Sequence, residues 1–352
     1  MNPSFWQGRR VLVTGHTGFK GSWLTLWLAE LGAKVTGYAL PPVGTTNLFE
    51  QARVGDKVES VVADIRDAER LLQVMRDAQP EVVLHLAAQS LVRASYDAPV
   101  ETFSVNVMGT THVLEATRHV PSVRSVVIVT TDKCYENREW VWGYREGDSL
   151  GGLDPYSASK ACAELVTSAY RRSFFATRPI GIASVRAGNV IGGGDWATDR
   201  IVPDIIRAAL VGESVLVRNP ASTRPWQHVL DVLHGYLVLA ERLAGDPTRF
   251  ADAWNFGPAP DDVRAVRDLA ETICSRWGAG ARWHHEAVEQ PHEARALTLD
   301  STKARTALGW RPTLAFESAV HWTVDWYKAH RDAADLAVTT LDQVRRFQEL
   351  AL

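Results

Sequence analysis

The first half of the chain alternates short apolar segments with segments whose apolar residues recur at helical spacing. The apolar segments predict strands at 10–14, 33–38, 58–63, 81–86 and 125–130, and the helical patterns cover 22–31, 68–78 and 104–119. Strands that are apolar on both faces are typical of a parallel sheet covered by helices on both sides. We therefore predict an α/β fold built on a doubly wound parallel sheet.

Glycines occupy positions 15, 18 and 21, between the first predicted strand and the first predicted helix. Gly15 permits a sharp turn, Gly18 lets the backbone approach a pyrophosphate, and Gly21 lets the helix pack on the sheet. The N–H groups at the start of that helix would face the phosphates. This placement predicts a Rossmann-type dinucleotide site; the alternative is a plain turn with packing glycines.

Further positions along the sheet are candidates for the same cofactor. Asp64 could accept from an adenine amino group or cap the following turn, and Ala87 and Ala88 are small enough to let a cofactor lie against backbone. The usual ribose-binding carboxylate is missing after the second strand, as is an arginine for a 2′-phosphate, and NAD is favoured over NADP. The remaining candidates are Thr17, Phe19, Lys20, Ile65, Leu86 and Thr130.

The second half of the chain is less regular. The segment from 132 to 154 predicts an ordered loop, and irregular Gly- and Pro-containing stretches follow at 188–204 and 257–262. We predict a dinucleotide-binding domain at 1–187, to which segments around 225–255 return. Residues 188–352 would form mainly a smaller, interleaved lobe for the substrate.

Composition excludes several classes of protein. The net charge is −3, so no basic field exists to hold nucleic acid. The three cysteines have no metal-type spacing and form a poor disulfide framework, which favours a reduced, cytoplasmic compartment and predicts no metal site. No apolar run approaches the roughly 18 residues of a membrane span, and no apolar signal region precedes the first strand.

Tyr156 and Lys160 stand four residues apart, so on a helix they share one face. A nearby ammonium favours the phenolate and is expected to lower the pKa of Tyr156. Tyr156 is thus a candidate acid/base for hydride transfer at a carbinol carbon, and Thr131, just upstream, could complete the site. The alternative is a surface pair on a helix.

The glycine loop, the Tyr156/Lys160 pair and the segments 86–89, 186–190, 224–229 and 308–310 resemble the extended short-chain dehydrogenase/reductase family. The resemblance covers nearly the whole chain. It implies a Rossmann-type fold with tightly held NAD. It also implies a homodimer, in which the helices at 104–118 and 157–173 pair across a two-fold axis as a four-helix bundle.

Within that family, the segments 15–23, 130–137, 142–144 and 192–196 are similar to those of the CDP-glucose 4,6-dehydratases. This branch implies an internal redox cycle on a nucleotide sugar. The C4 hydroxyl is oxidised while Tyr156 takes its proton, water is lost across C5 and C6, and hydride returns to C6. The product is a 4-keto-6-deoxy sugar nucleotide.

Many sugar-nucleotide dehydratases carry an Asp-Glu pair as acid and base for the elimination, whereas this chain has Asp132-Lys133. Asp132 can keep the acid role if burial raises its pKa, although the adjacent ammonium opposes that shift. Lys133 can act as a base only when neutral. Otherwise it stabilises the developing enolate, leaving Glu136 or water as base; a surface salt bridge between Lys133 and Glu136 is the structural alternative.

The diphosphate of such a substrate needs cationic or N–H partners. The resemblance places Arg224 and Asn189 in segments that line the phosphates, and Arg200 and Arg218 are further candidates. His292 stands where relatives carry a substrate-facing polar group, but the arginine they place before it is absent. Trp142, Tyr144 and Trp196 could wall the sugar or base, or pack in the core.

Two other functions compete with this prediction. The first is a dehydratase or epimerase for another nucleotide sugar, such as a dTDP-, GDP- or UDP-hexose. An epimerase needs no acid at the C6 hydroxyl, so Asp132 argues against it. The second is a non-catalytic dinucleotide-binding sensor, against which the intact Tyr156/Lys160 pair argues.

Overall fold

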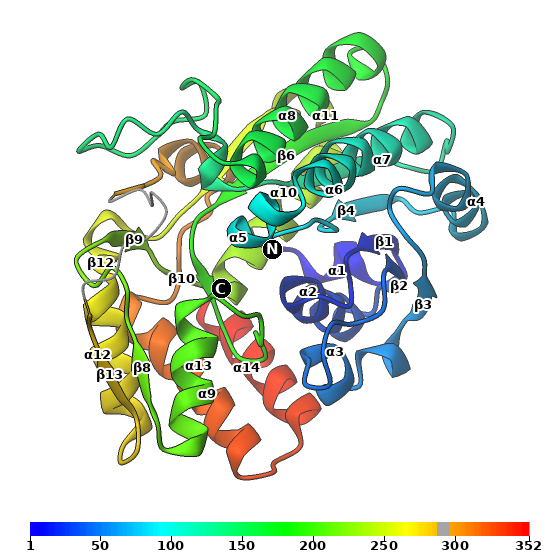
Figure 1. Ribbon diagram of the computed structural model, residues 1–352. Helices are drawn as coiled ribbons and strands as arrows, with labels where there is room; N and C mark the ends of the chain where they lie inside the picture. The colour runs from blue at the N-terminus through cyan, green and yellow to red at the C-terminus, as the bar shows by residue number, and fades with distance from the viewer. Residues whose placement is uncertain (287–295, 352) are drawn as a thin grey trace.

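The computed structural model describes residues 1–286 and 296–351 and has the predicted α/β architecture. Its centre is a seven-stranded sheet in the order β11-β6-β5-β4-β1-β2-β3, in which every neighbouring pair is parallel (Figure 1). The strands are β1 (Arg10–Thr14), β2 (Lys34–Ala39), β3 (Glu59–Val62), β4 (Val82–His85), β5 (Ser125–Val129), β6 (Gly181–Ala187) and β11 (Ala253–Phe256). The Rossmann-type sheet predicted from the sequence is confirmed.

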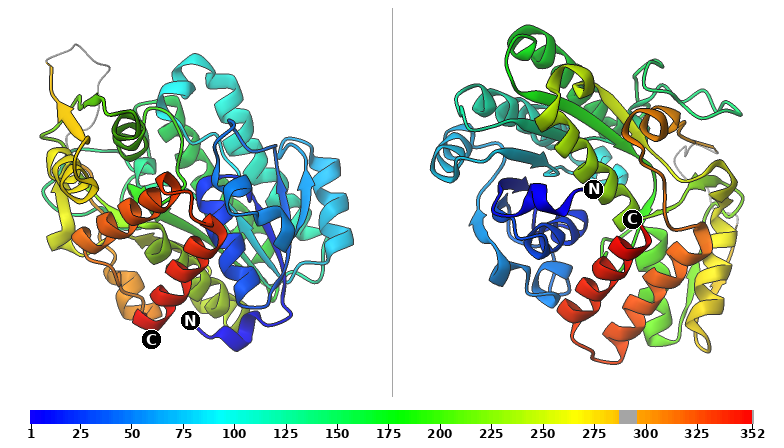
Figure 2. Two further views of the ribbon diagram at one scale, coloured as in Figure 1. Left: turned by 90° about the horizontal axis from the view of Figure 1, so that it is seen from below. Right: turned by 180° about the vertical axis from the view of Figure 1, so that it is seen from behind.

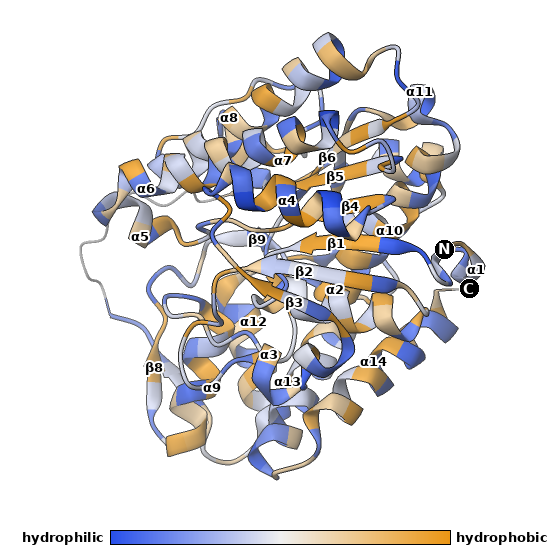
Figure 3. Ribbon diagram, turned by 90° about the vertical axis from the view of Figure 1, so that its right-hand side faces the viewer, coloured by the Kyte–Doolittle hydropathy of each residue, from blue (hydrophilic) through white to orange (hydrophobic). Residues whose placement is uncertain are grey.

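Helices cover both faces of this sheet because side chains alternate along each strand. Val11 and Val13 belong to one apolar cluster, and Leu12 between them belongs to another. The central strands β1, β4 and β5 are mainly apolar, with charged residues at the starts of β1 and β2, whereas the helices around them mix apolar and polar residues (Figure 3). One face carries α2 (Phe19–Glu30), α10 (Val229–Gly245) and α14 (Leu336–Leu350), and the other carries α4 (Ala68–Ala78), α7 (Gly109–Arg118) and α8 (Pro155–Tyr170).

The predicted helix at 104–119 differs from the structure at its start. Residues Ser104–Met108 form a π-helical turn, η2, before α7 begins. The wider turn coincides with a buried amide: Asn106 accepts from the backbone N–H of Gln89 (2.9 Å) and donates to the hydroxyl of Ser159 (2.8 Å). Hydrophobic periodicity does not report such a turn, because it shifts the helix register by only one residue.

A smaller lobe lies beside the sheet (Figures 1 and 2). It contains α9 (Ile201–Val211), α12 (Val266–Trp277), α13 (Phe316–Arg331) and the short strands β7 (Val190–Ile191), β8 (Ser214–Leu216), β9 (Thr223–Pro225), β10 (Gln227–His228), β12 (Val263–Ala265) and β13 (Arg282–His284). Between these elements, α10 and β11 join the sheet. The end of the chain also packs there, with the ring of Phe347 in α14 at 5.6 Å from that of Trp27 in α2. The domain boundary at 187 stays a prediction.

Short helices complete the described chain: α1 (Pro3–Trp6), α3 (Leu48–Gln51), η1 (Val54–Lys57), α5 (Val92–Asp97), α6 (Pro99–Phe103), η3 (Asp132–Cys134), η4 (Arg171–Phe175), α11 (Pro247–Phe250), η5 (Pro260–Asp262) and η6 (Ala304–Leu308). Among residues 1–286 and 296–351, no helix combines the length and apolar character needed to span a bilayer. The carboxyl ends of β1, β4, β5 and β6 meet at one edge of the sheet. In open α/β sheets, ligands bind at this edge.

Candidate active site

The glycine loop forms a tight cradle at the end of β1. Gly15 adopts a φ of +77°, and a Cβ on it would lie 2.7 Å from the backbone nitrogen of Ala87. A Cβ on Gly21 would lie 2.0 Å from the carbonyl oxygen of Gly15, so the start of α2 can approach the strand only because this residue is glycine. Gly18 is the exposed N-cap of α2, and a Cβ on it would make only an ordinary contact, 3.4 Å from the carbonyl oxygen of Gly15. The loop therefore leaves room for a pyrophosphate at the helix N-terminus.

The other predicted cofactor positions line the same edge of the sheet or its neighbouring loops. Leu86, Ala87 and Ala88 directly follow β4, and Ala87 N–H donates to the hydroxyl of Thr14 (3.2 Å). Thr17 donates to the carbonyl oxygen of Leu40 (2.9 Å). Ile65 is buried against Gly109, whereas Phe19 and Lys20, in the first turn of α2, are half-buried.

The carboxylate of Asp64 already has protein partners. Its Oδ1 accepts from the backbone N–H of Arg66 (2.9 Å), and the Arg66 guanidinium pairs with it at 2.5 Å. The turn-capping alternative is therefore present in the structure. An adenine contact at Asp64 remains a prediction.

A histidine in the glycine loop is a feature that the sequence reasoning did not interpret. His16 is buried, and burial lowers its pKa to about 4. Its Nε2 lies 2.7 Å from the hydroxyl of Ser60, and a Cβ on Gly37 would lie 2.4 Å from its ring. The ring therefore occupies space beside the end of β2, where the ribose-binding carboxylate is missing.

Tyr156 and Lys160 occupy the first two turns of α8, and both side chains are buried. Asp154 caps this helix by accepting from the backbone N–H of Ser157 (2.9 Å). The hydroxyl of Thr131 is hydrogen-bonded to Tyr156, and the Lys160 ammonium donates to the carbonyl oxygen of Val129 at the end of β5 (3.1 Å). The predicted pair thus lies at the carboxyl edge of the sheet rather than on the surface.

The prediction that Lys160 lowers the pKa of Tyr156 is wrong for the protein by itself. Burial raises the pKa of Tyr156 to about 12, and the hydrogen bond from Thr131 opposes that rise only in part. Burial also lowers the pKa of Lys160 to about 7, assisted by the nearby charge of Lys20. Desolvation is the largest influence on the pKa of both groups, and the ammonium donates to Val129 rather than to the phenol.

Asp132 is buried at the start of η3, directly after β5. Burial raises its pKa, and the adjacent Lys133 opposes this shift without reversing it. The Oδ1 atom is hydrogen-bonded to the hydroxyl of Thr131 (3.1 Å), while Oδ2 is buried and has no partner among the described residues. A Cβ on Gly188 would lie 2.9 Å from Oδ2, so this glycine leaves the space that the carboxyl group occupies.

Lys133 is half-buried, and its backbone N–H donates to the hydroxyl of Thr131 (3.3 Å). The alternative of a salt bridge between Lys133 and Glu136 is not seen among the described ion pairs. Glu136 pairs instead with Arg138, at 3.1 Å. Among the described ion pairs, Lys133 therefore does not form the surface salt bridge that was the alternative to a role in the chemistry.

Three of the predicted phosphate ligands come together near Asp132 and Tyr156. Arg224 is buried in β9 and lowers the pKa of Asp132 from its burial-raised value. Arg200, the N-cap residue of α9, pairs with the buried Asp195 (2.9 Å). Asn189 is half-buried between β6 and β7.

Two predicted substrate residues lie elsewhere. Arg218 is farther along the lobe and pairs with Asp199 (3.0 Å). His292 lies outside the described residues. Among residues 1–286 and 296–351, no three His, Cys, Asp or Glu side chains gather as a metal site.

The three aromatic candidates divide between surface and core. Trp142 is 61% exposed, whereas Tyr144 is buried in a stack with Tyr135 at 5.2 Å between ring centroids. Trp196 packs edge-on against Tyr327 (5.2 Å). Core packing therefore accounts for Tyr144 and Trp196.

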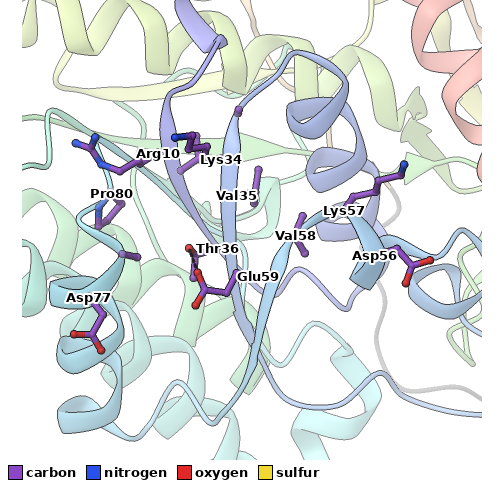
Figure 4. Close-up of a pocket in the computed structure, with 13 residues that line it drawn as sticks. Arg10, Lys34, Val35, Thr36, Asp56, Lys57, Val58, Glu59, Asp77 and Pro80 are labelled. Atoms are coloured by element: carbon purple, nitrogen blue, oxygen red, sulfur yellow. Dashed lines mark hydrogen bonds between the residues drawn. The ribbon is translucent and has the colours of Figure 1, made fainter.

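One depression lies away from these residues. It has a volume of about 630 Å³ and is lined by the starts of β1, β2 and β3, including Arg10, Lys34 and Glu59 (Figure 4). This is the amino edge of the sheet, opposite the glycine loop and Tyr156. It mixes positive and negative side chains and gathers none of the predicted site residues.

A dinucleotide cradle, a buried Tyr-x-x-x-Lys pair and a seven-stranded parallel sheet together define an extended short-chain dehydrogenase/reductase. The sequence profile of the family described as GDP-mannose 4,6 dehydratase matches residues 12–323, and the chain belongs to this family.

Individual relatives fall within the same class. The CDP-glucose 4,6-dehydratase of Salmonella typhimurium is 50% identical over 349 residues, which cover 98% of this chain and 97% of the relative. The UDP-glucose 4-epimerase of Mycolicibacterium smegmatis is 29% identical, covering 91% of this chain and 98% of the relative. Among solved structures, the dTDP-glucose 4,6-dehydratase DesIV of Streptomyces venezuelae, with NAD bound, superposes with a TM-score of 0.79 at 26% identity, covering 93% of this chain and 99% of that chain.

Proposed function

We propose that the protein dehydrates CDP-D-glucose to CDP-4-keto-6-deoxy-D-glucose with NAD as cofactor, as a hydro-lyase of deoxysugar biosynthesis. The observation that carries the proposal is Asp132, a buried carboxyl with one unpartnered oxygen, held by Thr131 beside Tyr156. The 50% identity to a CDP-glucose 4,6-dehydratase supports the choice of nucleotide.

The cradle between β1 and α2 fits a dinucleotide. Gly21 allows the helix N-terminus to approach the strand, and Gly18 is exposed at that terminus. Solved relatives at 26% identity contain NAD. When bound, NAD accepts hydride from C4 of the sugar and returns it at C6.

Tyr156 is the proposed base for the C4 hydroxyl. Its phenol must lose a proton to accept one, so a pKa near 12 in the isolated protein has to fall in the loaded site. An interaction with Thr131 lowers the pKa of Tyr156, and the buried Lys160 supplies positive charge on the same helix face. These two groups would stabilise the phenolate once the positively charged cofactor is in place.

The elimination is assigned to Asp132 and Lys133. The 4-keto group acidifies the C5 proton, which passes to Lys133 in its neutral form. The C6 hydroxyl leaves as water with the proton of Asp132, whose raised pKa keeps it available as an acid. In the alternative, Lys133 stays charged and stabilises the enolate, and Glu136 or water takes the proton.

The substrate diphosphate is assigned to the basic side of the site. Arg224 lies close enough to Asp132 to lower its pKa. Arg200 likewise interacts electrostatically with Tyr156. Asn189 adds an amide next to the same edge of the sheet. Arg218 would contact the nucleotide only farther out in the lobe.

The proposed function is tested by following a deuterium label from C4 of the sugar into the product. CDP-glucose carrying deuterium at C4 should give a product with the deuterium at C6, because hydride removed from C4 returns at C6. An epimerase would leave the label at C4 and release no water. A product that retains deuterium at C4 contradicts the proposal, and mass spectrometry of the sugar fragments distinguishes the two.

A homodimer is the proposed assembly. Several large apolar side chains are exposed on α6, η2, α8 and η4, including Val100 (82%), Met108 (46%), Leu165 (59%) and Phe174 (41%). Such a patch on neighbouring helices is typical of a protein–protein interface. The family resemblance supports a four-helix bundle formed by these helices from two copies.

We also propose that the protein acts in the cytoplasm. Its cysteines Cys134, Cys162 and Cys274 are all free thiols, which fits a reducing compartment. Fractionation of cells that produce the protein tests this: recovery outside the cytoplasm contradicts it.

A further inference from the structure

Glu164 is a buried carboxylate on α8, one helical turn beyond Lys160. It accepts hydrogen bonds from the hydroxyls of Thr130 (2.5 Å) and Ser184 (2.6 Å) and from the guanidinium of Arg186 (2.8 Å). Although burial disfavours its charged form, Arg186 and these hydroxyls hold the pKa of Glu164 below its ordinary value. The group is therefore a fixed negative charge inside the protein.

Arg186, in β6, connects Glu164 to Tyr135. Its Nη1 donates to the hydroxyl of Tyr135 (2.8 Å) and to the carbonyl oxygen of Glu146 (3.1 Å), and its guanidinium lies 4.8 Å from the Tyr135 ring. The Tyr135 hydroxyl in turn donates to Oδ1 of Asn255 in β11 (2.8 Å). Three neighbouring elements of the sheet and α8 thus meet at one buried network.

The two anchored residues, Thr130 and Tyr135, flank the proposed catalytic turn. That turn has only weak hydrogen bonds of its own: Cys134 N–H to the carbonyl oxygen of Thr131 is 3.4 Å, and Tyr135 N–H to that of Asp132 is 3.3 Å. We propose that Glu164 is a positioning residue that, directly through Thr130 and through Arg186 to Tyr135, fixes the turn carrying Thr131, Asp132 and Lys133.

The same carboxylate acts on Lys160. Burial and the charge of Lys20 lower the pKa of Lys160, whereas Glu164 and the Cys134 thiol raise it, and His85 from β4 also faces the ammonium. Removing the charge of Glu164 should therefore lower the pKa of Lys160. If the proposed function holds, the alkaline limb of the activity profile would then move to lower pH.

Hydrogen exchange tests the positioning role without any substrate. In Glu164→Gln, one oxygen that accepts hydrogen bonds becomes an amide donor facing other donors. The backbone N–H groups of residues 133–135 should then exchange about tenfold faster or more, the factor that loss of one buried hydrogen bond gives. Tyr135→Phe removes the hydroxyl that links Arg186 to Asn255 and should accelerate the same amides.

The matched control is Asp231→Asn, which alters another buried carboxyl, bonded to the backbone N–H groups of Thr313 and Leu314. It should lower stability without accelerating exchange at 133–135 selectively. Parental exchange at these amides in both Glu164→Gln and Tyr135→Phe overturns the proposal. If Glu164→Gln does not fold, Tyr135→Phe alone decides it.

Kinetics add a second readout, measured with whichever nucleotide hexose the parent protein dehydrates. Glu164→Gln should lower kcat about tenfold or more with little change in KM, and move the alkaline limb down by about one pH unit. Asp231→Asn should leave that limb in place. A parent that dehydrates a different sugar nucleotide contradicts the proposed function but not the role of Glu164. An unmoved alkaline limb together with parental kcat contradicts the role of Glu164.

Discussion

The hydroxyl of Thr131 lies 3.1 Å from Oδ1 of Asp132 and hydrogen-bonds to it, while Oδ2 of the same carboxyl is buried without a partner among the described residues. One oxygen is thus held by the protein and the other is left for a ligand. Since burial raises the pKa of Asp132, its proton persists to a higher pH than on an ordinary carboxyl.

Asp132→Asn should therefore block water loss while sparing the first oxidation. The amide keeps the shape of the side chain but cannot deliver a proton to the C6 hydroxyl. We expect kcat for dehydration to fall by about 10² to 10⁴-fold. Reduced cofactor should still accumulate when CDP-glucose is added, as measured by its absorbance. Parental dehydration by Asp132→Asn would remove Asp132 from the chemistry.

Lys133→Met tests the other half of the elimination. It keeps an unbranched side chain but removes the amine. The first hydride transfer should survive, whereas water loss and deuterium exchange at C5 should slow together, by about 10²-fold or more. Glu136→Gln is the control, because Glu136 pairs with Arg138 at the surface. If Lys133→Met dehydrates at the parent rate and Glu136→Gln does not, the base is Glu136.

Gly18→Glu tests the cofactor site. Gly18 is exposed and a Cβ on it would make only an ordinary contact with Gly15 (3.4 Å), so the glutamate should be accommodated without unfolding the protein. Its carboxylate would lie where the loop is proposed to hold a pyrophosphate, and like charges repel there. We expect NAD content on purification and activity to be lost, with the unfolding temperature of the cofactor-free protein preserved. Retention of both would show that the loop assignment is wrong.

Leu165→Arg tests the proposed dimer. Leu165 is 59% exposed on α8, so a charged side chain is tolerated in a monomer but not in the centre of an apolar interface. Light scattering at micromolar concentration should give a dimer for the parent and a monomer for the variant. A monomeric parent contradicts the assembly directly.

Residue spacing along the sequence predicted the elements whose structure depends on nearby residues in the chain. The strand at 10–14 lies at its predicted bounds, because three apolar residues and a threonine stand between a charged residue and a glycine. The Tyr156/Lys160 pair could likewise be placed from helical spacing. The π-helical turn at Ser104–Met108 could not, since it depends on where the Asn106 amide finds partners.

The hydrogen-bond network around Glu164 could not be predicted from the sequence either, because it also depends on tertiary packing. Glu164 follows Lys160 at helical spacing, which is a signal that could have placed it near the site. Its pairing with Arg186 across α8 and β6 depends on tertiary packing. The pKa of Tyr156 was mispredicted because spacing alone gives the charge of Lys160 but not the burial that both side chains experience.

The most direct test of the central claim is the comparison of kcat/KM for loss of water from CDP-, dTDP-, GDP- and UDP-glucose by the purified protein with NAD. The account predicts that CDP-glucose has the highest kcat/KM and yields the 4-keto-6-deoxy product. A higher kcat/KM with dTDP-glucose, or with either of the other two nucleotide sugars, would contradict it.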